Sequence, residues 1–120
     1  MTQTTSPALA TALAYHQAWT SQNLDQAMAY IASDITCDAP GARICGAQPY
    51  RDFLGRFMTK LTGMQTAAAF GDDTTAVLFN YPHTAATSDA PTAECFTVAD
   101  GKITRSVLVF DRPSFAPLQP

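Results

Sequence analysis

The stretch YHQAWTSQNLDQAMAYIASDITCDAP, residues 15–40, has the pattern of two helices followed by a strand, and this order of elements indicates the fold. Its first residues continue a helix that is expected to start at Pro7, with the hydroxyl of Ser6 capping free amides. Asn23 and Gln26 have the spacing of a capping box, so a second, short helix follows almost at once. The stretch then closes on strand-forming residues that a Pro-Gly pair stops, and a loop through Cys45 and Gly46 is expected to follow. Two helices leading into a strand are therefore expected.

Beyond this stretch, the spacing of apolar residues is first helical and then becomes that of strands. Pro49 opens a third helix whose apolar residues recur at helical spacing, and Gly63 is expected to end it. Beyond it the period becomes two, and Asp100-Gly101 is a strong hairpin signal. The expected strands span residues 64–70, 74–81, 92–99 and 103–110. Helices followed by hairpin-linked strands predict an α+β domain in which one curved, mainly antiparallel sheet wraps three helices.

The composition is that of one globular domain over residues 1–120, with a core at about 7–111 and an extended, proline-rich tail at 112–120. Apolar residues make up 47% of the 120 residues and charged residues 14%. The net charge is −3 and the basic residues form no run, so no nucleic-acid partner is expected. No stretch has the length of a membrane span, and the N-terminus lacks the features of a signal peptide. The sequence therefore predicts a cytoplasmic protein without a membrane partner.

Cysteine and histidine usage argues against a metal or redox cofactor. The three cysteines have no CxxC spacing, and in a reducing compartment such thiols are small buried hydrophobes. The two histidines have no neighbours of ligand type at helical spacing. The chain also lacks a phosphate-binding loop, a dinucleotide fingerprint and a nucleophile elbow. We therefore predict no metal and no cofactor.

The opening stretch resembles the start of ketosteroid isomerases and SnoaL-like polyketide cyclases, in the nuclear transport factor 2-like superfamily. The similarity continues through the helix with Gly46, Arg51 and Phe53 to the closing hairpin ADGKITR, over most of residues 8–111. It implies a cystatin-like fold, a cone-shaped barrel of one strongly bent sheet closed by three helices around an apolar cavity. It also implies a homodimer formed through the back of the sheet.

The resemblance also points to candidate catalytic residues. In the isomerases a helix tyrosine and a protonated strand acid bind the dienolate oxygen, while an aspartate on the first long strand moves the proton. The tyrosine corresponds to Tyr15 and the neutral acid to Glu94. The base position corresponds to Ala39, with Asp38 one residue earlier. Alternation turns Asp38 away from the cavity, unless a bulge before Pro40 brings it inward.

The environment of Glu94 is left open by the sequence. If its strand face lines the cavity, loss of hydration raises the pKa of the carboxyl and makes it a donor or a general acid; on the outer face it is an ordinary surface glutamate. Aromatic residues at regular spacing either fill a core or line a pocket, and both interpretations stand. The residues expected to contact a ligand are Trp19, Phe53, Phe57, Asn80, Phe96, Leu108 and Phe110.

Three functions follow from this pattern. The first is proton transfer, of isomerase or cyclase type, on a small apolar molecule with a carbonyl group, using Tyr15, Glu94 and Asp38. The second is binding of such a molecule without conversion, because the family base position holds an alanine. The third is a dimerisation module with a filled interior. In each case Val107 and Val109, on the back of the sheet, suit a second copy of the chain.

Overall fold

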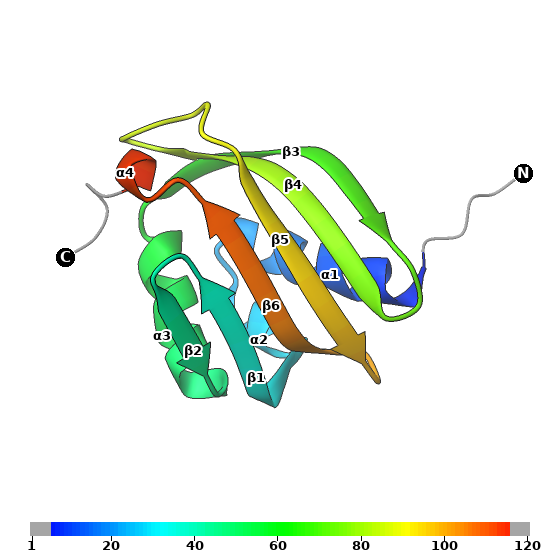
Figure 1. Ribbon diagram of the computed structural model, residues 1–120. Coiled ribbons are helices and arrows are strands. Elements are labelled where there is room, and N and C mark those ends of the chain that lie inside the picture. Colours follow the sequence, from blue (N-terminus) through cyan, green and yellow to red (C-terminus); the bar gives the residue numbers. More distant parts are fainter. Residues whose placement is uncertain (1–5, 116–120) are drawn as a thin grey trace, which may run out of the picture.

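The computed structural model describes residues 6–115. It consists of one curved sheet with helices against its concave face (Figure 1). The strand order is β2-β1-β6-β5-β4-β3, and every neighbouring pair is antiparallel except β1 and β6. The helices are α1 (Pro7–Thr20), α2 (Leu24–Met28), α3 (Ala47–Met58) and α4 (Arg112–Phe115). The strands are β1 (Ile31–Ala39), β2 (Ala42–Cys45), β3 (Leu61–Gly71), β4 (Thr75–Thr84), β5 (Thr92–Ala99) and β6 (Lys102–Phe110).

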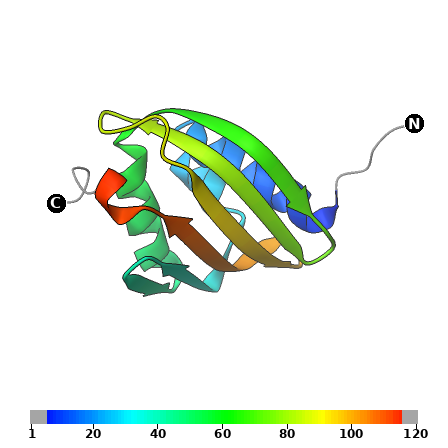
Figure 2. The same cartoon turned by 45° about the horizontal axis from the view of Figure 1, so that its top comes forward.

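The predicted α+β class, with a mainly antiparallel sheet curved around three helices, is confirmed. The sheet arches over α1, α2 and α3 (Figure 2). Its edge strands, β2 and β3, pair only with β1 and β4, so the sheet is open and the helices close the cone. Among the described residues, no helix has both the length and the apolar character needed to span a bilayer.

The first helix begins at Pro7, as predicted, but its cap differs from the expectation. Ser6 has extended dihedral angles, and its hydroxyl makes no capping hydrogen bond and is buried without a partner in the described structure. The fixed φ of Pro7 is therefore the main local signal for the start of the helix. Ala8 and Ala12 are fully buried, and their small side chains let α1 pack closely against β3, β4 and β5.

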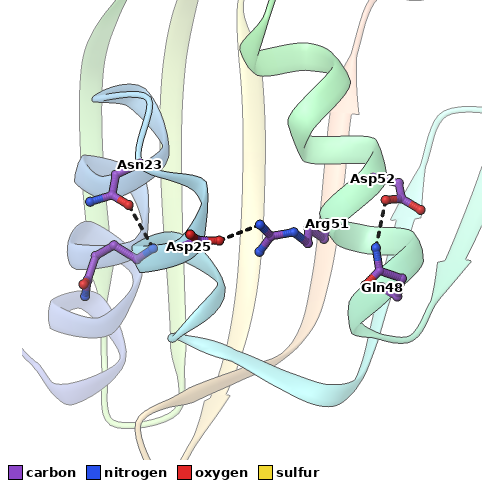
Figure 3. Close-up of polar contacts among 6 residues, drawn as sticks. Asn23, Asp25, Gln48, Arg51 and Asp52 are labelled. Carbon is purple, nitrogen blue, oxygen red and sulfur yellow. Dashed lines mark hydrogen bonds and ion pairs between the residues drawn. The ribbon is translucent and has the colours of Figure 1, made fainter.

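An exposed ion pair links the second and third helices (Figure 3). Asn23 caps α2 as predicted, because its side-chain oxygen accepts a hydrogen bond from the backbone amide of Gln26 at 3.1 Å. Asp25, in the first turn of α2, then pairs with Arg51 of α3 across 2.5 Å. Both side chains are open to water, so the pair is worth at most about 1 kcal/mol and mainly sets the relative position of the two helices.

Two predicted boundaries are wrong. Gly63 does not end the third helix, which stops at Met58; it lies inside β3, where the ring of His83 packs against its backbone. The segment after β1 was expected to be a loop. It forms the edge strand β2 instead, because Gly41, with φ of 76°, turns the chain into a tight hairpin.

The predicted extended tail is also only partly correct. Residues 112–115 form the short helix α4, and Phe115 is buried because its ring packs edge-on against Phe57 and Phe110. The packing of Phe115 therefore holds α4 against the end of the cone. Residues 116–120, for which an extended tail was also predicted, lie outside the described residues.

The core lies between the concave face of the sheet and the helices. Along β4 the side chains of Ala76, Leu78 and Asn80 are buried, while Val77 and Phe79 between them are exposed. This alternation follows the period of two that a strand with one buried face requires. The same alternation decides which polar side chains of β1, β5 and β6 face the interior.

Replacing Leu78 by alanine is expected to lower the free energy of unfolding by about 2–5 kcal/mol, because it removes buried methyl groups and leaves a void. The matched control is Leu13→Ala, the same change on a side chain that is 36% exposed. It is expected to cost under about 0.5 kcal/mol. Urea unfolding followed by circular dichroism measures both, and equal costs would contradict the placement of Leu78.

Candidate functional site

A cavity of about 380 Å³ opens on the concave side of the sheet, a size suited to a small molecule. Its wall is mainly apolar and comes from α1, α3 and α4, from β4, β5 and β6, and from the turn between β1 and β2. Most of the residues predicted to contact a ligand do line it. These are Trp19, Phe53, Phe57, Asn80, Leu108 and Phe110.

Phe96 does not belong to this wall, contrary to the prediction. Its side chain is fully buried, and its ring packs edge-on against Tyr15 with centroids 5.7 Å apart. It lies two residues beyond Glu94 along β5, opposite Ser106 of β6. Both Phe96 and Glu94 face the concave side, but at Phe96 the helices already fill the space.

Two tyrosines from different helices meet at the cavity. The hydroxyl oxygens of Tyr15, on α1, and Tyr50, on α3, are 2.5 Å apart, and both residues are at most 2% exposed. One hydroxyl donates to the other, so the pair keeps one phenol proton for a further acceptor. Burial raises the pKa of both phenols, and the Glu94 carboxylate adds to the rise. The phenols therefore stay protonated and act as donors.

Tyr50 is the partner that the sequence interpretation missed as a site residue. It belongs to the same face of the third helix as Leu54 and Phe57, whose helical spacing predicts a buried apolar face. The signal in the sequence is that a buried tyrosine hydroxyl needs a hydrogen-bond partner. Tyr15, on another helix, has the same need, so the two hydroxyls could have been paired.

Glu94 faces the cavity, which decides between the two alternatives left open by the sequence. It lies between Leu78 of β4 and Leu108 of β6, and the hydroxyl of Ser106 donates to its Oε2 at 2.5 Å. The residue is half-buried. Burial raises the pKa of the carboxyl from 4.5 to about 7, although the bond from Ser106 opposes this rise. Near neutral pH the group can therefore both take and give a proton.

Asp38 lies on the opposite face of the sheet. Its carboxylate pairs with Arg43 of β2 and Arg105 of β6, each at 3.3 Å. The preceding residue, Cys37, points inward and is buried. Burial raises the pKa of this thiol to about 11, so it stays protonated near neutral pH. The structure thus brings Tyr15 and Glu94 to one cavity and leaves Asp38 outside it.

The bulge that would turn Asp38 inward is not found before Pro40. In the pairing of β1 with β6, the register shifts only between Ile31 and Thr36, and the later pairs are regular. Ala39, at the family base position, does line the cavity, but its methyl group cannot carry a proton.

Two further polar atoms of the wall have no hydrogen-bond partner within residues 6–115. They are the side-chain oxygen of Asn80 and the indole nitrogen of Trp19, both buried. A buried polar group without a partner is costly, and a ligand with a matching group would remove that cost. In the same part of the chain, no three His, Cys, Asp or Glu side chains come together as a metal site would need.

The curved sheet with three helices under it is the fold of a nuclear transport factor 2-like protein from Cytophaga hutchinsonii ATCC 33406, which is 14% identical, with a TM-score of 0.79 over 96% of this chain and 99% of that one. Residues 12–106 match the family model of the SnoaL-like domain, so the chain belongs to the SnoaL-like family. Among curated proteins, no sequence matches the chain.

Solved structures show the same fold. A protein from Kribbella flavida DSM 17836 is 45% identical, with a TM-score of 0.90 over 95% of this chain and 94% of that one. A predicted polyketide cyclase from Xanthomonas campestris pv. campestris is 22% identical, with a TM-score of 0.72 over 94% and 97%. A predicted ketosteroid isomerase from Kribbella flavida is 18% identical, with a TM-score of 0.70 over 88% and 78%.

The pKa of Glu94 predicts how stability changes with pH. The folded chain holds the proton up to about pH 7 and the unfolded chain only to about 4.5, so this contribution to stability is complete below pH 4.5 and is lost as the pH rises to 7. Glu94→Gln does not titrate at this position. Its stability relative to the wild type is therefore expected to rise across this interval, by at most about 3 kcal/mol.

Urea unfolding of both proteins at several pH values measures this difference. His16 titrates with the opposite sign, because burial lowers its pKa from 6.5 to about 4 and its contribution is lost as the pH falls. Since both proteins contain His16, its effect cancels in the comparison. A difference that does not change with pH would show that Glu94 is ordinarily hydrated.

Proposed function

We propose that this protein is an enzyme that binds a small, mainly apolar molecule with a carbonyl group and moves a proton on it, in a reaction of isomerase or cyclase type. One observation carries the proposal: Glu94, with a pKa near neutrality, faces the same cavity as the hydroxyl pair of Tyr15 and Tyr50. Membership of the SnoaL-like family and the likeness in fold to the predicted cyclase and isomerase support it.

The proposed chemistry divides the work between two groups. The free proton of the tyrosine pair donates to the carbonyl oxygen of the ligand and stabilises the negative charge that grows there. Glu94, as carboxylate, takes a proton from the carbon next to the carbonyl group and, as carboxylic acid, returns it to another carbon. Ser106 holds the carboxyl in place, and the apolar wall keeps water away from the enolate. Glu94 thus serves as the base that moves the proton, the role that the sequence analysis gave to Asp38.

The second candidate is binding without conversion. It is favoured by the alanine at the family base position and by the outward direction of Asp38. In this case the phenols, the Asn80 oxygen and the Trp19 nitrogen hold a ligand, and Glu94 serves as a hydrogen-bond donor in its protonated form.

We also propose that the chain forms a homodimer through the outer face of the sheet. Apolar side chains gather there on β3, β4 and β6, and Phe70 lies directly opposite Val77 in the pairing. Monomers rarely leave such a patch open to water. Its exposed members are Phe70, Val77, Phe79 and Val109, with exposed fractions of 70, 38, 38 and 58%.

We further propose that the protein is cytoplasmic. Cys37, Cys45 and Cys95 form no disulfide within the described residues, and Cys45 is exposed. Thiols of this kind persist in a reducing compartment.

Exchange of carbon-bound protons tests the proton transfer. The probe is 2-tetralone, an apolar bicyclic ketone, and proton NMR in D₂O follows the loss of its α-protons. The wild type is expected to speed this exchange, and Glu94→Gln to lower the rate by about 100-fold or more. Tyr15→Phe is expected to cost less, because Tyr50 keeps a hydroxyl, whereas loss of both hydroxyls is expected to cost about 100-fold.

Asp38→Asn separates the two candidate bases. It is expected to exchange protons at the wild-type rate, because its carboxylate lies outside the cavity. Loss of exchange in this variant, with Glu94→Gln still active, would assign the base to Asp38. Binding of 2-tetralone by the wild type with no added exchange would favour the second candidate function.

Val109→Glu tests the proposed dimer. A charge in the middle of an apolar interface is costly, so the variant is expected to sediment as a monomer at concentrations where the wild type is a dimer. Leu13→Glu, which places the same charge on an exposed apolar site of α1, is the matched control and is expected to remain dimeric. A monomeric wild type would remove this part of the proposal.

A further inference from the structure

Three of the seven basic side chains of the chain line the cavity. Arg56 lies in the last turn of α3, Lys60 follows the end of this helix by two residues, and Arg112 begins α4. All three are exposed to water as well as lining the cavity. We refer to Arg56, Lys60 and Arg112 as the entrance cations.

The remaining four basic side chains are engaged elsewhere. Three form ion pairs with carboxylates, and the fourth donates a hydrogen bond to a backbone carbonyl. The contacts are Arg43 and Arg105 with Asp38, Arg51 with Asp25, and Lys102 with Ala29. In the described part of the chain, the basic residues without such a partner are therefore the ones that line the cavity.

Within residues 6–115 no carboxylate pairs with the entrance cations. Two acids lie near them in the sequence, Asp52 four residues before Arg56 and Asp111 next to Arg112. Asp52 accepts a hydrogen bond from Gln48 (Figure 3), and Asp111 accepts one from Ser114. Of the ten acidic residues, Glu94 alone lines the cavity, and its raised pKa reduces its negative charge at neutral pH. The entrance thus holds three cations that no carboxylate of the described residues pairs with directly, on a chain whose net charge is −3.

Packing holds one of these cations in place. The guanidinium of Arg112 lies against Gly41, where a Cβ atom would come within 2.8 Å of its Nη1. The helix that carries Arg112 is anchored by Phe115, whose ring packs edge-on against Phe57 and Phe110 at centroid distances of 6.2 and 5.6 Å. The guanidinium of Arg112 therefore lies beside the turn between β1 and β2, at the edge of the cavity.

We infer that the ligand of this cavity carries an anionic group, a carboxylate or a phosphate, that binds the entrance cations while its apolar, carbonyl-bearing body fills the interior. Like charges at one place repel each other, and an anion between them removes the repulsion and accepts charge-assisted hydrogen bonds. The apolar wall takes the rest of the molecule. This inference rests on the proposed function and adds the substrate class and its orientation, with the anion outward.

Three aryl ketones of similar size test it: 4-benzoylbenzoate, its uncharged amide, and 4-benzoylphenyl phosphate. Trp19 is the single tryptophan of the chain and lines the cavity, so its fluorescence reports occupancy. At low salt at least one anion is expected to bind about tenfold more tightly than the amide, since three exposed charges act together. The preference is expected to fade at about 0.5 M NaCl because salt screens exposed charges.

Substitution of the entrance cations by glutamine is expected to abolish the preference, so that the anions and the amide bind with similar affinity. The matched control is Arg51→Gln, on the same helix, whose guanidinium pairs with Asp25 outside the cavity. It is expected to keep the preference. Whichever anion binds more tightly identifies the group as carboxylate or phosphate.

The outcomes separate this inference from the proposed function. Equal affinity of the wild type for the anions and the amide would overturn the inference and leave the proposed function standing. A preference that survives in the triple variant would overturn it as well. If none of the probes alters Trp19 fluorescence, the proposed function itself fails, and the inference fails with it.

Discussion

Side chains of a strand point in turn to its two faces, and in a strongly curved sheet the two faces offer different environments. The concave side is covered by helices and is largely dry, while the convex side meets water. Two acids show the consequence. Glu94 points inward, where burial raises its pKa to about 7, and Asp38 points outward, where Arg43 and Arg105 neutralise it. The direction of one Cα–Cβ bond thus decides whether a carboxyl group lines the cavity or forms ion pairs on the outer face.

The helices complete this environment by bringing their own polar groups to the dry side. Tyr15 and Tyr50 come from α1 and α3, and their mutual hydrogen bond satisfies each ring while leaving one proton available. The inner part of the cavity therefore holds protonated phenols and a carboxyl that exchanges its proton, and the outer part holds cations. Such a gradient from neutral to positive gives a bound molecule one preferred orientation.

Much of this architecture is local in origin and could be predicted. Capping at Asn23, the turn at Asp100-Gly101 and the period of two in the later strands each depend on neighbouring residues. The alternation of side chains also predicts the outward direction of Asp38. Glu94 and Tyr15 were placed by resemblance, and the structure brings both to the cavity wall.

What could not be predicted depends on contacts between distant segments. The pairing of Tyr15 with Tyr50 joins residues 35 apart on two helices, and no local pattern encodes it. Phe96 shares a strand face with Glu94, yet only the depth of helix packing decides that one is core and the other wall. Helix α4 forms where prolines suggested an extended chain, because Phe115 packs against aromatic residues at the end of the cone.

Helix α4 follows β6 and takes no part in the pairing of the strands, so its sequence can change without disturbing the sheet. The part of the cavity wall that α4 supplies, Arg112 above all, can therefore vary while the pairing of the strands stays the same.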